Sequence, residues 1–299
     1  MTYSFDKIED VQVGVYTMPT SDPESDGTLK WEATTMVVVE VRADSVTGMG
    51  YTYSHGAAAQ IIEDVLSPCL LGESAMDVGR LWLHMMQSLR NLGHVGLGAA
   101  AISAVDVALW DLKARRLDVP LVHLMGALRT RVPVYGSGGF TSYDDDQLSR
   151  QLGGWVEQGI SRVKIKIGRH PDDDERRVAL AREVIGEKTE LFVDANGALD
   201  RKEALLMASR LQHYGVSWFE EPVSSDDLDG LRMLRDRAPS GMEITAGEYG
   251  WDIFSFRRLL EAGAVDVVQA DATRCGGYTG FLQVANLCWA HNVPLSAHT

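Results

Sequence analysis

The second half of the chain alternates between short apolar runs and longer stretches of helical periodicity, and this alternation limits the folds open to it. Strands that are separated by helices form parallel sheets, so a (β/α) barrel is predicted, with a flavodoxin-like sheet as the alternative. Polar residues at the end of every strand favour the barrel. The seven apolar runs are Val132–Tyr135, Val163–Ile167, Leu191–Val193, Trp218–Phe219, Ile244–Ala246, Val265–Gln269 and Pro294–Ser296.

The predicted barrel occupies residues 129–299 and lacks its C-terminal end. Helices are expected between the strands, for example over Asp172–Ile185, Arg201–His213 and Gly277–His291. A closed barrel of this type has eight strands, whereas the given sequence ends at Thr299, directly after the seventh predicted strand. The expected fold is therefore α/β, a modified TIM barrel of (β/α)7β type without its last part.

Residues 1–128 follow a different order, with strands first and helices afterwards. Alternating β-branched residues predict strands over Ile8–Val15 and Met36–Val41. Between them, Thr17–Lys30 is rich in Pro, Ser, Asp and Gly, which predicts a mobile loop. This part is predicted to be an α+β domain. Its helical stretches are Ala57–Leu66, Asp77–Leu92 and Gly98–Arg116.

The charge of the chain argues against one large class of partners. The 299 residues include 28 basic and 42 acidic side chains, a net charge of −14, which would repel a nucleic-acid backbone. No apolar run reaches the roughly 18 residues that span a bilayer, so no membrane partner is expected. The three cysteines show no Cys-x-x-Cys spacing and the N-terminus shows no secretory signal, so a cytoplasmic protein is predicted.

Three carboxylates follow successive predicted strands and indicate a metal site. Asp194, Glu220 and Glu248 lie 26 and 28 residues apart, each where a strand ends. Carboxylates that converge on one point repel each other unless a cation neutralises them. Mg²⁺ is the hard divalent ion that best suits such oxygen ligands. The alternative is that each acid separately caps a helix or pairs with a surface arginine.

Two lysines and one Asp–His pair are candidates for acid–base chemistry. Lys164 and Lys166 are two residues apart, so both side chains leave the same side of their strand. That side is either the outer surface or the barrel interior, and the nearby acids favour the interior. A second cation and a metal would lower the pKa of such a lysine and make it a base. Asp271 could similarly orient His298 and raise its pKa, although a lone histidine at a strand end is more often structural.

Six motifs, in order, make the chain resemble the enolase superfamily, and specifically its mandelate racemase subgroup. The subgroups related to muconate lactonizing enzyme and the dipeptide epimerases place a lysine on strand six, and this chain has no lysine after Lys202. The segment 96–112 also resembles the helix that joins the cap to the barrel in this family. The motifs are Lys164-Ile165-Lys166, Asp194-Ala195-Asn196, Trp218-Phe219-Glu220-Glu221-Pro222, Gly247-Glu248, Asp271 with Gly276-Gly277, and Ser296-Ala297-His298.

The resemblance implies an N-terminal capping domain over the barrel and a set of roles for the residues at the strand ends. Mg²⁺ on Asp194, Glu220 and Glu248 would chelate a substrate carboxylate and stabilise an enediolate. Lys164 would neutralise the carboxylate, Lys166 would be the base on one face, and His298 with Asp271 the acid–base on the other. Ser137 and Asn196 resemble polar substrate contacts. The family also implies a homo-oligomer.

These roles serve two reactions on a small-molecule carboxylate, and the motifs do not choose between them. In a dehydratase the histidine protonates a departing β-hydroxyl, whereas in a racemase or epimerase it returns the proton to the α-carbon. The segments 17–30 and 51–55 are rich in hydroxyl groups, which favours a sugar acid. An acid-sugar dehydratase, a hydro-lyase, is therefore predicted. The alternatives are a racemase or epimerase of a 2-hydroxy acid and a non-catalytic barrel with a binding role.

Overall fold

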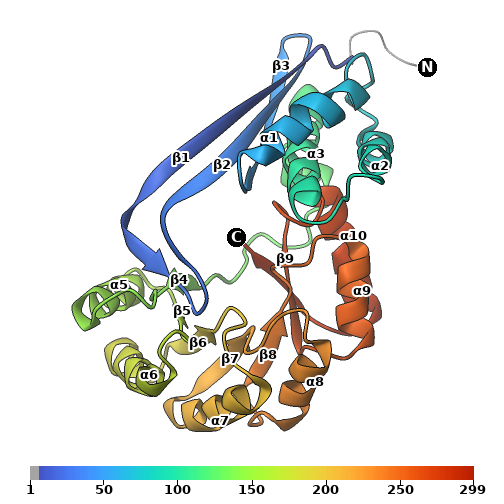
Figure 1. The fold of residues 1–299 in the computed structure, drawn as a ribbon. Helices are drawn as coiled ribbons and strands as arrows, with labels where there is room; N and C mark the ends of the chain where they lie inside the picture. Colours follow the sequence, from blue (N-terminus) through green and yellow to red (C-terminus); the bar gives the residue numbers. More distant parts are fainter. Residues whose placement is uncertain (1–6) are drawn as a thin grey trace.

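The computed structural model describes residues 7–299, which form an antiparallel sheet with helices above a parallel sheet with helices (Figure 1). The N-terminal segment 1–6, where the sequence shows no secretory signal, lies outside the described residues. We call residues 7–124 the cap. Its sheet has the order β1-β2-β3, with β1 (Asp10–Ser25), β2 (Lys30–Ala43) and β3 (Val46–Tyr53).

The helices of the cap pack on one face of this sheet, and α3 is the central one. The carbonyl oxygen of Ala108 would lie 2.3 Å from a Cβ on Gly48, and that of Ala104 would lie 2.1 Å from a Cβ on Gly50. Glycine at both positions therefore lets β3 approach the backbone of α3 closely. The helical elements are α1 (Ala57–Ile61), the π-helical η2 (Ile62–Leu66), the 3-10 helix η3 (Ser67–Cys69), α2 (Val78–Ser88), α3 (Leu97–Arg116) and α4 (Leu121–Leu124).

The second part is a curled parallel sheet of seven strands in the order β10-β9-β8-β7-β6-β5-β4. Helices cover its outer face (Figure 1). The predicted barrel with an N-terminal cap is thus confirmed, and β4 and β10 are the edges of the sheet in the described part of the chain. The elements are β4 (Gly136–Gly138), α5 (Asp145–Glu157), β5 (Arg162–Lys166), α6 (Pro171–Ile185), β6 (Glu190–Asp194), α7 (Arg201–Leu211), η4 (Gln212–Tyr214), β7 (Val216–Glu220), α8 (Leu228–Arg237), β8 (Glu243–Ala246), α9 (Ile253–Glu261), β9 (Val267–Asp271), α10 (Gly277–Ala290) and β10 (Leu295–His298).

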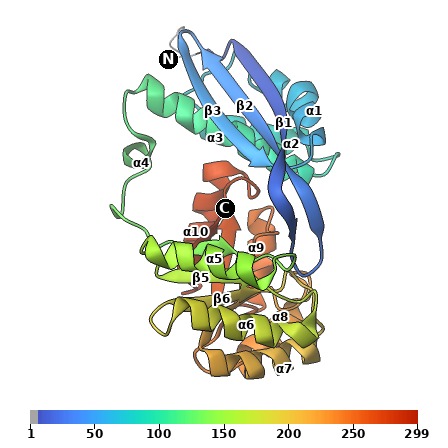
Figure 2. The same ribbon diagram turned by 90° about the vertical axis from the view of Figure 1, so that its left-hand side faces the viewer.

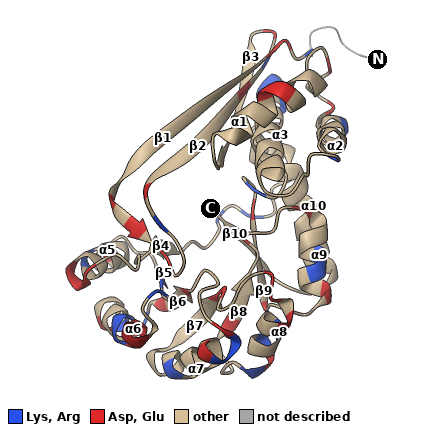
Figure 3. Cartoon of the chain, in the orientation of Figure 1, with Lys and Arg blue, Asp and Glu red and all other residues tan. Residues whose placement is uncertain are grey.

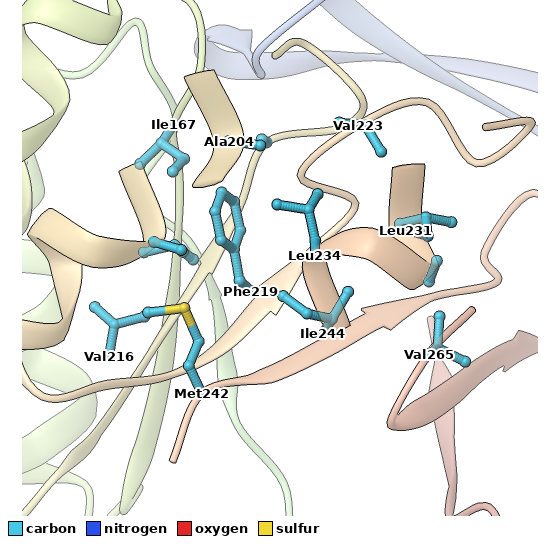
Figure 4. Packing of buried hydrophobic residues seen from close by; sticks show 14 of the residues in the cluster. Ile167, Ala204, Val216, Phe219, Val223, Leu231, Leu234, Met242, Ile244 and Val265 are labelled. Atoms are coloured by element: carbon cyan, nitrogen blue, oxygen red, sulfur yellow. The ribbon is translucent and has the colours of Figure 1, made fainter. Parts of the chain in front are cut away.

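Apolar side chains fill the layer between the parallel sheet and its helices. Figure 4 shows Phe219 of β7 among Ile167, Leu234 and Ile244, all of them fully buried. Strands covered on one side by helices and curled around an interior on the other are apolar on both faces, which explains the unbroken apolar runs in the sequence. This packing fixes the strands so that their carboxyl ends meet at one rim.

The prediction of a mobile loop over Thr17–Lys30 is wrong, because β1 continues to Ser25 and β2 begins at Lys30. The two prolines that suggested a loop, Pro19 and Pro23, lie in an edge strand. Proline has no N–H to donate, and an edge strand tolerates this because one of its sides has no partner strand. The pairing also shifts between Pro19 and Glu24. Only the turn between the two strands is left as a loop.

The first strand of the barrel was predicted four residues too early. Val132 and Val134 are exposed, and the strand β4 covers Gly136–Gly138 instead. A Cβ on Gly136 would lie 2.5 Å from the Trp155 ring of α5, so the strand needs glycine where α5 packs closely. Glycine carries no β-branched signal, which is why the sequence pattern missed this strand. Figure 2 shows the connection that follows α4 running down the side of the molecule toward α5.

The β1–β2 hairpin spans from the cap to the rim of the barrel, and its tip is fixed there (Figure 1). Arg169, after β5, donates from Nε to the carbonyl oxygen of Asp26 (2.9 Å) and from Nη2 to that of Leu29 (2.6 Å). The hydroxyls of Ser25 and Thr141 lie 2.6 Å apart. At Gly27 a Cβ would lie 2.2 Å from the carbonyl oxygen of Ala195, so the tip lies directly on the loop after β6.

Within residues 7–299, none of the helices combines the length and apolar character that crossing a membrane requires.

The Arg169 contact predicts that Arg169→Gln loosens the hairpin tip while the barrel stays folded. Losing two hydrogen bonds to backbone carbonyls should speed amide exchange over residues 17–31 by about tenfold. Hydrogen–deuterium exchange with mass spectrometry measures this. Arg176→Gln is the matched control, because Arg176 of α6 pairs at the surface with Asp173 of the same helix and with Asp145 of α5. Equal exchange in the two variants would show that the tip is held by other contacts.

Candidate active site

The three carboxylates predicted as metal ligands lie at the carboxyl ends of adjacent strands. Asp194 ends β6 and is paired in register with Glu220, which ends β7. Glu248 follows β8 by two residues. Asp194 and Glu220 are fully buried and Glu248 is 5% exposed. Figure 3 shows acidic and basic positions together where β5 and β6 end.

Both lysines of β5 point into the barrel, toward these acids. The Lys164 Nζ donates to Glu220 Oε2 at 2.5 Å and lies 3.4 Å from Asp194 Oδ2. The Lys166 Nζ donates to Asp194 Oδ2 at 2.5 Å and to Asn196 Oδ1 at 3.1 Å. The interior orientation expected from the acids is therefore observed, and the alternative of an outward-facing pair is excluded.

The predicted lowering of the lysine pKa does not arise from the protein groups. Burial lowers the pKa of Lys164, but the charges of Glu220 and Asp194 outweigh burial and raise the pKa well above its usual value. For Lys166, burial likewise lowers the pKa, but the charges of Asp194, Glu220 and Glu248 together raise it above its usual value. Each ammonium is thus held charged by the acid that it faces. Making either lysine a base requires a second cation to share those carboxylates.

Carboxylate oxygens at this rim are left without protein donors. The Glu220 Oε1 and Glu221 Oε1 atoms are buried and have no hydrogen-bond partner among the described residues. Burial raises the pKa of Glu220, and the neighbouring Asp194 raises it further. Burial and the charge of Glu248 raise the pKa of Glu221 well above its usual value. Oxygen donors that lack partners and repel each other fit a hard divalent cation such as Mg²⁺.

His298 lies between two carboxylates at the end of β10. Its Nδ1 is 3.0 Å from Asp271 Oδ2 and its Nε2 is 2.6 Å from Glu248 Oε2. Burial lowers the pKa of His298, but the hydrogen bonds to Asp271 and Glu248 outweigh burial and raise the pKa to about 9. The expected Asp271–His298 contact is present. Glu220, Glu248 and His298 also bring one donor atom each within 4.8 Å of one another.

Thr273 and Arg274 contact Asp271 and Glu248, and the sequence motifs did not identify either residue. Thr273 donates from its backbone N–H and its hydroxyl to Asp271 Oδ1, both at 2.7 Å. Arg274 has Nε 3.6 Å from Asp271 Oδ2 and Nη1 3.7 Å from Glu248 Oε1. Their position directly after Asp271 was the available signal, since residues that follow a strand end reach the same rim.

The two predicted polar substrate contacts differ in their surroundings. Asn196 is nearly buried, has a positive φ of 47°, and reaches Lys166 and, through its N–H, Asp194 Oδ1. Ser137 is exposed on β4, where it is paired in register with Lys164. Asn196 therefore belongs to the charged cluster, whereas Ser137 lies at the edge of the sheet.

An aromatic layer, also missed, forms the floor under the lysines. The Tyr135 ring lies 5.2 Å from Lys164 Nζ and meets Phe192 edge-on, and Phe192 stacks on Trp218 with ring centroids 5.1 Å apart. These rings line a cavity of about 1500 Å³ that opens between the edge strands β4 and β10. Its other lining residues lie mostly at the amino ends of the strands, so this space is the concavity of the open sheet. The charged cluster lies at the opposite rim.

Two family models match the chain. The model described as "Mandelate racemase / muconate lactonizing enzyme, N-terminal domain" matches residues 13–126, and "Enolase C-terminal domain-like" matches residues 147–299. The chain is 32% identical over 305 residues to L-talarate/galactarate dehydratase of Salmonella typhimurium, covering 98% of this chain and 76% of that protein. It is 35% identical over 302 residues to 3,6-anhydro-alpha-L-galactonate cycloisomerase of Streptomyces coelicolor, covering 97% and 82%.

Solved structures agree in fold. A mandelate racemase/muconate lactonizing enzyme-like protein from Rubrobacter xylanophilus superposes with a TM-score of 0.96 at 50% identity, covering 98% of this chain and 81% of that one. A racemase from Streptomyces coelicolor A3(2) with bound magnesium superposes with a TM-score of 0.93 at 34% identity, covering 98% and 83%.

The contacts of His298 predict how stability depends on pH. Because folding raises its pKa from 6.5 to about 9, the stabilisation is complete below pH 6.5 and is lost as the pH rises through 9. Relative to His298→Gln, the wild type should lose at most about 3 kcal/mol of unfolding free energy across that range. Urea unfolding in EDTA at several pH values measures it. The control is His291→Gln, an exposed position after α10; a wild-type curve parallel to that of His298→Gln would refute the prediction.

Proposed function

Because the chain belongs to the mandelate racemase/muconate lactonizing enzyme family of the enolase superfamily, we propose that it removes the proton next to the carboxylate of a sugar acid and eliminates water. On this proposal it is an acid-sugar dehydratase, a lyase whose product is a 2-keto-3-deoxy acid. The observation that carries the proposal is the buried cluster in which two lysines and an Asp–His pair flank three adjacent carboxylates.

Asp194, Glu220 and Glu248 are the proposed Mg²⁺ ligands. The buried oxygen of Glu220 that has no donor supports this role, as does the rise in the pKa of Glu220 caused by burial and Asp194. When bound, Mg²⁺ supplies Lewis-acid stabilisation of the negative charge that develops on the substrate carboxylate. Relatives with bound magnesium, such as the Streptomyces racemase, support the choice of metal.

Lys164 and Lys166 act from β5 in this proposal. The buried Lys164 ammonium is fully charged and would pair with the substrate carboxylate, since it already binds carboxylates. Lys166 would take the proton from the α-carbon. It can serve as a base only once Asp194 turns to another cation, because Asp194 now holds its pKa high. Asn196 would fix the position of the Lys166 amine through its amide oxygen.

His298 would act from the opposite side of the site, on β10. With Asp271 on Nδ1, its Nε2 is the nitrogen that faces the centre of the site, where Glu248 lies. The high pKa of His298 keeps it protonated near neutrality, so it can donate a proton to a departing β-hydroxyl. Ser137 remains a proposed substrate contact at the site's edge.

Similarity to dehydratases supports elimination over racemisation. Relatives at 31–33% identity include L-talarate/galactarate, arabinonate and L-rhamnonate dehydratases, named for sugar acids, and D-galactarolactone cycloisomerase, named for the lactone of one. Racemisation of a 2-hydroxy acid is the second candidate, because one solved relative is described as a racemase. A racemase, too, would need an acid–base group on each face of the substrate. A homo-oligomer and a cytoplasmic location remain predictions.

The metal assignment predicts which substitutions remove Mg²⁺ binding. Asp194→Asn, Glu220→Gln and Glu248→Gln should each weaken binding at least about tenfold, because each removes one anionic oxygen ligand. Isothermal titration calorimetry with MgCl₂ measures the change. Glu243→Gln, at the exposed start of the strand β8 that leads to Glu248, is the matched control. Unchanged affinity in all three site variants would place the metal elsewhere.

The proposed reaction predicts the product that forms and the loss of activity when the base Lys166 is replaced. With Mg²⁺ and a panel of mono- and dicarboxylic sugar acids in D₂O, the α-proton signal should disappear as a 2-keto-3-deoxy acid forms, followed by NMR. Lys166→Met should lower this rate at least about 1000-fold, because the base is removed. Lys202→Met, on the outer helix α7, should leave the rate unchanged. Deuterium incorporation with retention of the β-hydroxyl would instead establish a racemase or epimerase, and no reaction with any acid would favour a binding role.

A further inference from the structure

Helix α10 lacks an N-terminal cap of its own. The residue before it, Gly276, has no side chain and adopts a φ of 92°. A helix N-terminus leaves backbone N–H groups that a side-chain oxygen normally satisfies. For α10 that oxygen comes from the N-terminal domain, residues 7–124. Asp106 of α3 accepts from the Thr279 N–H (2.9 Å) and from the Thr279 hydroxyl (2.6 Å). Thr279 is the third residue of α10, and the N–H at this position is the one that the side chain of an N-cap residue ordinarily binds.

Further groups of the cap close around the same turn. Ser103 Oγ accepts from the Gly276 N–H at 2.8 Å, and Trp82 Nε1 donates to the Gly276 carbonyl at 2.8 Å. Trp110 Nε1 donates to the Thr279 hydroxyl at 2.9 Å. A Cβ on Gly277 would lie 2.3 Å from Asp106 Oδ2, so only glycine allows this approach. Asp106 is fully buried, and such a group is costly unless it holds partners in place.

We call the contacts of Trp82, Ser103, Asp106 and Trp110 with Gly276 and Thr279 the clamp. A short turn connects the clamp to the proposed acid–base pair. Asp271 ends β9 five residues before Gly276, and its carbonyl accepts from the N–H groups of Arg274 and Cys275. The hydroxyl of Thr52, on β3 of the cap, donates to the carbonyl of Thr273 at 2.7 Å. The turn is therefore held at both ends by the cap, and a shift of α10 would move the Asp271 carboxylate.

The lysine side of the site is held differently. Lys166 contacts Asp194 and Asn196, which belong to β6 and the turn after it. In the sheet, β7 and β8 separate β6 from β9. A disturbance at α10 should thus reach the two sides of the site unequally.

We propose that Asp106 is a positioning residue that keeps Asp271, and through it His298, aligned by capping α10 from the other domain. This inference rests on the proposed function for the role of His298, but the geometry that it predicts is independent of any substrate. Burial raises the pKa of Asp106 to about 7, which agrees with a carboxyl group kept in this place despite its cost. The cap would then help to align the histidine side of the site as well as cover the barrel.

The test compares Asp106→Asn with Asp111→Asn, its matched control. Asp111 lies on the same helix, but its carboxylate contacts Met49 and Arg115 within the cap. The amide of Asp106→Asn keeps the shape but cannot accept both bonds from Thr279 through two carboxylate oxygens. The first readout is the Nδ1–H signal of His298 in protein labelled with ¹⁵N-histidine, assigned by its loss in His298→Gln. Asp106→Asn should shift or broaden that signal, and Asp111→Asn should leave it as in the wild type.

The second readout separates the two faces of the site. With the substrate identified by the acid panel, proton transfer through His298 should fall about 100-fold in Asp106→Asn, as expected when a group is displaced by about 1 Å. Exchange through Lys166 in D₂O should fall less than about threefold, since that side is anchored on β6. Equal losses on both faces, or an unchanged His298 signal, would overturn the positioning role.

The outcomes distinguish this inference from the proposed function. If the wild type transforms no acid, the proposed function fails, and the His298 signal alone decides the positioning role. If Asp106→Asn does not fold, Thr279→Val replaces it, because valine removes the hydroxyl that donates to Asp106 and keeps the N–H bond. Thr279→Val should shift the same signal in the same direction, and no shift would overturn the proposal.

Discussion

The confinement of like charges at one rim of a parallel sheet is the constraint on which the rest of this structure depends. Parallel strands bring their carboxyl ends together, so any acids placed there must be compensated at close range. Here the compensation comes from the ammonium groups of β5 and from a histidine and an arginine on the far side. The acids concerned are Asp194, Glu220, Glu221, Glu248 and Asp271. Two of them, Glu220 and Glu221, keep an oxygen without a donor among the described residues, which supports the proposed cation site.

This constraint also explains why the site has two unlike sides. The lysine side is held by local contacts between β5 and β6, and the hairpin tip covers the loops after these strands. The histidine side depends on a turn without an internal cap, and it is completed by α3 and β3 of the other domain. A two-base reaction needs both groups aligned at once. Under the proposed function, the cap would therefore contribute to the chemistry by positioning the histidine side as well as by covering the site.

Much of this could be predicted from the sequence because the relevant signals are local. The apolar runs and the acids that follow them predict the order of the strands and place Asp194, Glu220 and Glu248 together at one rim. The first strand escaped because its close packing on Trp155 requires glycine, and glycine carries no strand signal. The hairpin was taken for a loop because prolines and turn residues are also permitted in an edge strand. The roles of Thr273, Arg274 and Asp106 depend on contacts between segments that are distant in the sequence. Local sequence patterns do not predict such contacts.

The clamp between α3 and α10 has a consequence for how the chain assembles. The bond between Asp106 and Thr279 joins residues 173 positions apart, and that between Thr52 and Thr273 joins residues 221 positions apart. During synthesis the cap emerges long before α10. Until α10 is made, the Asp106 carboxylate and the Trp110 N–H of α3, and the Trp82 N–H of α2, lack these partners. Contacts of this range are slow to form and leave apolar surface open meanwhile. Helix α10, which is synthesised long after the cap, is thus the helix that completes the first domain.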